Sequence, residues 1–280
     1  MSYGPNPWQQ TSWDWRAAGN FIGGGVGSGL LMVAAAWGEP VAMWGLWLGL
    51  ACVGMGLVCV WLEIGRPLRA LHVFFNPATS WMSREAFVAL LLFPVGLLAL
   101  LGYAWARLPL AAMALAFLYC QSRMLPATRG IPAWRARALT PLMLATGLAE
   151  GCGLWMVLAS VLSARTNAAL PVFMALVVIR QVFWVRYRKA VDAQLAPRSR
   201  EALDRSGRTL MVLGTLGALA LAGLSLLLPA GTAASILTFG AGAAAIGAGA
   251  LFKYTLITRA AYNQGFSLKQ IPVRGVRTSN

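Results

Sequence analysis

Charged residues are scarce in this 280-residue sequence, and acidic residues are the scarcest of them. Only 11% of the residues are Asp, Glu, Lys or Arg, whereas 59% are hydrophobic. Soluble domains carry roughly a quarter charged residues, so this composition excludes a soluble enzyme and indicates an integral membrane protein. The formal net charge is +15. Because the basic residues lie between long apolar runs, where they set membrane orientation, the charge does not predict nucleic-acid binding.

Histidine and clustered cysteines are also lacking. The single histidine, His72, excludes a haem held by two histidines and a metal site built from several imidazoles. The four cysteines, Cys52, Cys59, Cys120 and Cys152, lie in apolar segments and form no CxxC pair. The sequence therefore predicts no haem, no iron–sulfur cluster and no disulfide framework in this chain. Any redox role would need an external electron donor or acceptor.

Apolar runs long enough to cross a bilayer are abundant, and such a crossing takes about 20 residues per helix. We predict an all-α integral membrane protein with eight transmembrane helices, grouped as two four-helix bundles within one membrane domain, residues 1–280. The predicted helices cover residues 17–37, 41–62, 85–106, 108–125, 138–162, 169–187, 208–228 and 233–257. The N-terminal segment lacks the basic start of a cleavable signal, so none is expected.

Basic residues fall on one side of this predicted topology. All but four of the 23 Lys and Arg residues lie in the two tails and the even-numbered loops. Arg107 and Arg165 lie in the opposite loops, and Arg180 and Lys253 lie near helix ends, where we expect them to reach the headgroups. Because basic loops stay in the cytoplasm, we expect a multi-pass protein of a bacterial-type inner membrane with both termini cytoplasmic.

Glycines gather in the first predicted helix, where residues 23–29 read GGGVGSG. A phosphate-binding loop would follow a strand and carry a Lys-Ser/Thr pair, and both features are missing. Small residues let membrane helices approach closely. The glycines therefore predict tight helix packing.

Residues 63–85, EIGRPLRALHVFFNPATSWMSRE, join the second and third helices at the predicted cytoplasmic boundary. Arg66, Arg69 and His72 recur every third residue, so a short helix would place them on one face. One interpretation of this segment is a solvated loop whose arginines only set orientation. For His72 the alternatives stay open, because a lone histidine can simply bond to a loop carbonyl.

Ionisable side chains at membrane depth are costly and usually face the interior of a bundle. We therefore interpret Glu63, Arg84 and Glu85 as a functional site, and we expect Ser83 to cap the third helix. Further polar groups at the same boundary end the fourth helix or begin the first.

A quinone is the ligand that suits these groups. Its tail needs an apolar cleft, its carbonyls need hydrogen-bond partners, and its two-electron reduction needs two protons that a carboxylate or an imidazole can relay. The predicted quinone-binding residues are Glu63, Glu85, Arg84, His72, Asn20, Tyr119 and Arg123.

Glu150 lies in the middle of the fifth predicted helix. It is either structural glue between helices or, with Glu63, part of a proton relay. A secondary transporter or proton-coupled carrier is the alternative function that Glu150 favours. Such carriers usually have inverted repeats with interrupted helices, and no convincing repeat is found here. A third alternative is a purely structural anchor.

The sequence resembles a known family at residues 63–70 and 80–85, EIGRPLRA and SWMSRE. These runs are similar to the NrfD-like membrane anchor subunits of molybdopterin oxidoreductases, which include the anchors of dimethyl-sulfoxide reductase and polysulfide reductase. Residues 131–134, IPAW, and residues 15–25 also resemble this family, and the two tails are similar to the membrane subunit of phenylacetyl-CoA:acceptor oxidoreductase.

The resemblance implies a quinone or quinol site in the first four helices. It also implies two partners on the cytoplasmic face, an iron–sulfur ferredoxin-like subunit and a molybdopterin catalytic subunit. By position, Glu63 matches the acidic or histidine residue before the family's Gly-Arg-Pro-like turn, which contacts the quinone, and Glu85 matches a second acid of that site. Asn20 and Tyr119 match polar positions of the first and fourth helices only loosely.

Overall fold

The computed structural model describes residues 7–37, 41–64, 67–164 and 168–265. Most residues in these ranges are helical, and one isolated β-bridge joins Gln9 and Tyr262. Eight segments are long and apolar enough to cross a membrane, which confirms the predicted all-α, multi-pass fold. These segments are Trp15–Ala36, Val41–Glu63, Trp81–Leu100, Ala104–Ala127, Leu139–Val161, Ala169–Gln194, Pro197–Leu227 and Thr232–Arg259.

Several of these segments combine α-helix with a turn of another helix type. The α-helices are α1 (Trp15–Ala36), α2 (Val41–Glu63), α3 (Trp81–Leu100), α4 (Arg107–Ala127), α5 (Pro132–Arg135), α6 (Leu139–Val161), α7 (Ala169–Val191), α8 (Pro197–Met211), α9 (Ala218–Leu227) and α10 (Thr232–Tyr254). Three 3₁₀ segments are η1 (Pro67–Phe75), η2 (Ala104–Ala106) and η3 (Asp192–Gln194). Two π-helical segments are η4 (Val212–Gly217) and η5 (Thr255–Arg259).

The third membrane helix begins earlier than expected. Ser80 caps α3, since its side chain accepts a hydrogen bond from the backbone N–H of Ser83 at 3.3 Å. The prediction that Ser83 caps the helix is therefore wrong, and Ser83 is buried inside it. The helix ends at Leu100 because the chain turns at Gly102, where φ is +92°.

The seventh membrane segment is longer than expected, because it begins at Pro197 rather than at residue 208. The first helical position suits Pro197, whose missing N–H costs nothing there. The added helix, α8, buries small and apolar side chains such as Leu203 and exposes arginines such as Arg198 and Arg205. Its arginines therefore lie on a helix rather than in the predicted loop.

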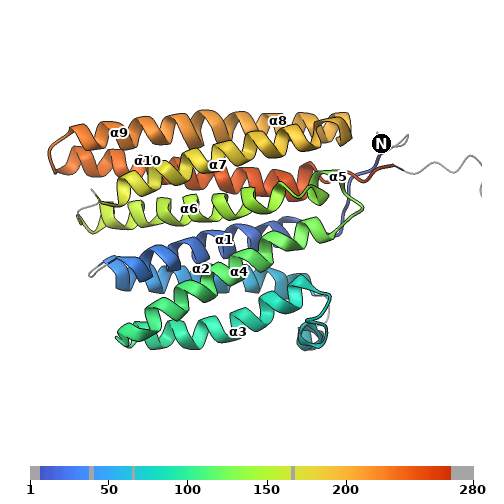
Figure 1. Ribbon diagram of the computed structural model, residues 1–280, viewed down its shortest axis with the longest axis horizontal. Coiled ribbons are helices and arrows are strands. Elements are labelled where there is room, and N and C mark those ends of the chain that lie inside the picture. Colours follow the sequence, from blue (N-terminus) through green and yellow to red (C-terminus); the bar gives the residue numbers. More distant parts are fainter. Residues whose placement is uncertain (1–6, 38–40, 65–66, 165–167, 266–280) are drawn as a thin grey trace, which may run out of the picture.

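Helix α1 runs through the middle of the molecule, with α2 and α4 on one side and α6 on the other (Figure 1). Its glycines make these close approaches possible. A methyl group on Gly29 would overlap the backbone of Gly147 in α6, and one on Gly27 would contact Gly49 in α2. This supports the packing interpretation of the glycine run. Because α1 packs closely on α2 and α4 of the first four membrane helices and also on α6 of the last four, the division into two four-helix bundles stays a prediction.

Both ends of the described chain lie at the same end of the bundle, beside α5 (Figure 1). The two ends pair directly, since the Gln10 N–H donates to the carbonyl of Ala261 at 2.9 Å. The indole N–H of Trp134 in α5 donates to the Leu256 carbonyl at 2.9 Å, so it ties the α4–α6 connection to η5. The segment η1 and the α7–α8 connection lie at this same end, which we call the basic end.

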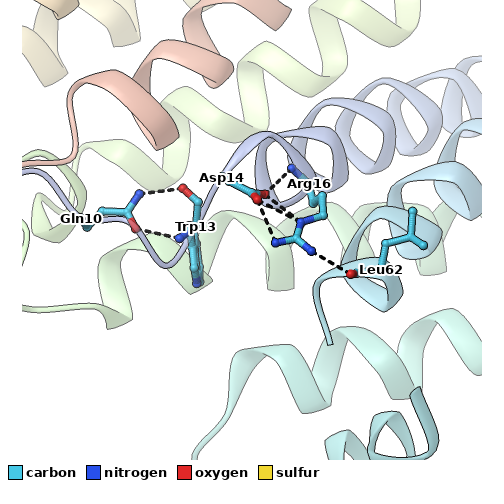
Figure 2. Close-up of polar contacts among 5 residues, drawn as sticks. All are labelled: Gln10, Trp13, Asp14, Arg16 and Leu62. Carbon is cyan, nitrogen blue, oxygen red and sulfur yellow. Dashed lines mark hydrogen bonds and ion pairs between the residues drawn. The ribbon is translucent and has the colours of Figure 1, made fainter. Parts of the chain in front are cut away.

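Figure 2 shows how the N-terminal segment enters α1. The Gln10 side chain binds both the N–H and the carbonyl of Trp13, each at 2.7 Å. Asp14 caps α1 by accepting from the Arg16 N–H at 2.8 Å, and hydrogen bonds from Arg16 hold the pKa of Asp14 below its usual value. Arg16 also donates to the Leu62 carbonyl at 2.9 Å, so it ties the start of α1 to the end of α2.

Candidate functional site

A carboxylic acid and two amide side chains meet between α1, α3 and α4. Glu85, Asn20 and Gln121 are each at most 3% exposed. The Gln121 Nε2 donates to the backbone carbonyl of Asn20 at 2.9 Å and to Glu85 Oε1 at 3.4 Å. The side chain of Asn20 also lies beside Glu85. We call these three residues the acid–amide cluster.

The acid–amide cluster fits into the bundle because glycines face it. A methyl group on Gly24 of α1 would overlap the side-chain amide of Gln121, and one on Gly56 of α2 would press on the Asn20 side chain. The Asn20 Oδ1 is buried and has no hydrogen-bond partner among the described residues. Since buried polar atoms are almost always bonded, this acceptor suits the hydroxyl of a bound ligand.

Aromatic rings and guanidinium groups gather on the same two helices, α3 and α4. The guanidinium carbons of Arg84 and Arg123 lie 4.2 and 4.9 Å from the centre of the Trp81 ring. Tyr119 meets that ring edge-on at 5.7 Å, and its hydroxyl accepts from Arg123 Nη1 at 3.3 Å. We call Trp81, Arg84, Tyr119 and Arg123 the aromatic–arginine group. Cation–π contacts of this kind hold flat rings and guanidinium groups together.

Arg84 and Glu85 are neighbours in sequence but act in different places. Arg84 donates to the carbonyls of Pro77 and Ala78 at 2.8 and 2.7 Å, so it ties the preceding turn to α3. Glu85 turns inward to Gln121 instead. The two side chains thus form separate sets of contacts rather than one Arg–Glu unit.

Glu63 and His72 lie apart from the acid–amide cluster in the contacts that the structure describes. Glu63 is the last residue of α2, is half-buried, and interacts electrostatically with Arg16 and Asp14. His72 lies in η1, where its exposed ring packs edge-on against Phe75 at 5.4 Å. The expected short helix is confirmed as η1, whereas Arg66 lies outside the described residues.

A second polar group lies deeper in the bundle. Lys253 of α10 and Glu150 of α6 are both 0% exposed, and Lys253 Nζ lies 2.5 Å from Glu150 Oε2. Arg180 of α7 is also 0% exposed. Its Nη1 donates to the Ala245 carbonyl at 2.9 Å, and its Nη2 donates to the Gly214 carbonyl. We call Lys253, Glu150 and Arg180 the buried ionic group.

The expectation that Arg180 and Lys253 reach the headgroups is therefore wrong. Both helices continue past their predicted ends, α7 to Val191 and α10 through η5 to Arg259, so the two side chains lie several residues inside the bundle. Glu150 neutralises Lys253, and Arg180 binds a carbonyl in the π-helical segment η4. Such π-helical turns within α-helices are rare, and they frequently lie at functional sites.

Gln121 is the member of the acid–amide cluster that lies towards the buried ionic group. Its Oε1 and Lys253 Nζ both lie within 4 Å of the position that a Cβ on Gly25 would take. Glu150 in turn packs against Gly249 of α10. A row of polar side chains therefore leads from Glu85 into the centre of the bundle. The signal for it in the sequence was a Gln and a Lys, each within the last two turns of a largely apolar helix.

The far end of the bundle from the basic end holds a cavity of about 690 Å³. It opens between the ends of α6, α9 and α10, and many of its lining residues carry hydroxyl groups. These are Ser160, Ser163, Ser225, Thr232, Ser235 and Thr238. The sequence did not indicate this cavity, because its hydroxyl residues come from three separate segments.

No family model matches this chain, and no curated protein matches it. Within the described residues, no group of three or more His, Cys, Asp or Glu side chains is arranged to hold a metal ion. The side chains of the acid–amide cluster can supply hydrogen bonds and proton exchange, by one buried carboxyl group between two amides.

Proposed function

We propose that this protein is a quinone-reactive membrane anchor, which exchanges electrons between a membrane quinone and an iron–sulfur partner subunit of a molybdenum or tungsten oxidoreductase. The acid–amide cluster is the proposed quinone site. The observation that carries this proposal is the buried Glu85 between Asn20 and Gln121, with the Asn20 Oδ1 left unpartnered.

The donor and acceptor set suits both redox forms of a quinone. The Gln121 Nε2–H that faces Glu85 at 3.4 Å can instead donate to a quinone carbonyl, and the Asn20 Oδ1 can accept from a quinol hydroxyl. Reduction of a quinone takes up two electrons and two protons. Glu85 can hold one of these protons at its carboxyl oxygen, next to the ring oxygen that loses or gains it.

The surface around the cluster also suits a lipid-soluble ligand. The Tyr119 ring, which is 40% exposed, offers aromatic surface for a flat head group, and Trp81 and Arg123 hold this ring and its hydroxyl in place. Exposed apolar side chains continue along α3, among them Phe87 at 40% and Leu90 at 58% exposure. An isoprenoid tail can lie along this face within the lipid.

The basic end is the proposed docking side for the partner subunits. Basic loops favour the cytoplasmic side of a membrane, so we place both termini in the cytoplasm of a bacterial-type cell. Exposed arginines at this end, such as Arg129 and Arg200, can steer an acidic iron–sulfur subunit towards the quinone site. Electrons would then cross from that subunit to a quinone beside Glu85.

Substitution of Glu85 tests the proposal. Glu85→Gln keeps the shape of the side chain but removes the exchangeable proton, and general acid–base groups contribute about 10²–10⁴-fold to rate. In the purified complex we expect quinone-linked turnover to fall by about 100-fold or more, while turnover with soluble artificial acceptors is unchanged. Glu201→Gln, at an exposed position of α8, is the matched control. Equal losses in both assays for Glu85→Gln would contradict a quinone role.

A secondary transporter is the second candidate, and two features favour it. The buried ionic group lies at membrane depth, as in many coupled carriers. The cavity lined by Ser225 and Thr238 opens at the opposite end of the bundle. If the protein is a transporter, proteoliposomes that contain this chain alone will accumulate a solute when a pH gradient is applied. The anchor proposal expects no such uptake.

A further inference from the structure

The buried ionic group carries more positive than negative charge. Lys253 and Arg180 are cations, and Glu150 is the one carboxylate in this group. A buried charge without a counter-charge is expensive in a bundle of low dielectric constant. Glu85 is the next buried carboxyl group along the polar row, and its ionised form would bring the charge of the whole row to zero.

The amide of Gln121 is oriented to link these two carboxyl groups. Its Nε2–H side faces the Glu85 carboxyl oxygen, whereas its Oε1 side lies with Lys253 Nζ against Gly25. The donor end therefore meets the acid and the acceptor end lies towards the ammonium group. A side chain at residue 25 would displace the Lys253 ammonium group, so the glycine keeps this arrangement open.

We propose that Glu85 and Glu150 are a coupled proton-holding pair, linked by Gln121 and Lys253. When a proton moves inward, the Glu85 carboxyl group loses it and the Glu150 carboxylate gains it, while Lys253 keeps its three protons. The Lys253 ammonium group, released by Glu150, then balances the new charge on Glu85 through the Gln121 amide. The pair therefore shares one proton between Glu85 at the boundary site and Glu150 in the centre of the bundle, whichever ligand that site binds.

Other charged or titratable groups face the pair and belong to the same equilibrium. Arg180 of α7 acts on Glu150 electrostatically. The Cys120 thiol of α4 interacts with both Glu85 and Arg84. Arg180 is held by backbone carbonyls and Arg84 by the turn before α3, so neither needs to move when the proton does.

Infrared difference spectroscopy of the purified protein between pH values tests this directly, because it detects the C=O band of a protonated carboxyl group. Loss of a band in Glu85→Gln or Glu150→Gln assigns that band to its residue. We expect each substitution to shift the titration midpoint of the other carboxyl group by about 1 pH unit or more, because two groups that interact by more than about one pK unit titrate as a coupled pair. The two shifts should be equal, since linkage between two binding equilibria is reciprocal.

Gln121→Leu should reduce both shifts, and Glu201→Gln should leave both bands unchanged. If Glu150→Gln does not fold, as judged by size-exclusion elution, the proposal is tested by comparing the titration midpoint of the Glu150 band in Glu85→Gln with that in the unmodified protein. An unchanged midpoint in folded Glu85→Gln protein would overturn the proposal. The experiment needs neither quinone nor partner subunit, so its failure and that of the quinone proposal are distinct results.

Discussion

Replacement of Lys253 by methionine removes one partner of the buried ion pair and is the sharpest test of the packing. Lys253 and Glu150 are both 0% exposed, so in the variant Glu150 either stays charged without its nearest cation or takes up a proton. Removal of one partner from a buried pair costs about 3–5 kcal/mol. Because Arg180 still acts on Glu150, we expect a loss near 3 kcal/mol, the lower end of that range.

Reversible unfolding in mixed detergent micelles measures this loss, and a double variant separates its causes. Lys253→Met with Glu150→Leu removes both charges, and apolar replacement of a whole buried pair is often neutral. The double variant should therefore recover most of the stability that Lys253→Met loses.

The exposed pair of α8 supplies the matched control. Arg205 and Glu201 are 71% and 70% exposed at an i,i+4 spacing, so Arg205→Met should cost only about 0.3–0.5 kcal/mol. If Lys253→Met costs as little as Arg205→Met, or if the double variant is as unstable as the sum of its single variants, the reasoning about the buried pair is refuted.

Two further substitutions test how the helices are built, each by the free energy of unfolding in the same micelle assay. Gly151→Ala would press a methyl group of α6 against the α1 backbone and should cost about 1–3 kcal/mol. Gly247→Ala, with open space around it, should be neutral or stabilising by up to about 1 kcal/mol. Similar effects of the two substitutions would contradict the close approach of α1 and α6. Ser80→Ala removes the cap of α3 and should cost about 1 kcal/mol, and no loss of stability would show that the cap contributes nothing.

The membrane spans could be predicted because each is a run of apolar residues long enough to cross a bilayer. The same criterion missed the amphipathic α8, because its arginines interrupt the apolar run. The buried face of α8 carries little more than Leu203, Leu210 and small residues. Helix ends were displaced where a side chain such as Ser80 decides them, because a second serine, Ser83, lies three residues further on and could equally be a cap from sequence alone.

The candidate site was predictable only in part. Asn20 and Glu85 were expected near each other because both lie close to the same membrane boundary. Their contact through Gln121, however, depends on which faces of α1, α3 and α4 meet, and the nearly uniform apolar composition of these helices does not reveal that. The Lys253–Glu150 pair joins residues 103 positions apart, so the sequence pattern alone gives no reason to connect them.

Photo-crosslinking with an azido-quinone in membranes tests the central claim most directly. If the acid–amide cluster is a quinone site, peptides of α3 and α4 around Glu85 and Tyr119 should be labelled. Glu85→Gln should reduce this labelling at least tenfold, because one hydrogen bond to a charged group contributes about 1.5–3 kcal/mol and a tenfold change corresponds to about 1.4 kcal/mol. Labelling confined to the far cavity, around Ser160 and Thr238, or labelling that Glu85→Gln leaves unchanged, would contradict the account.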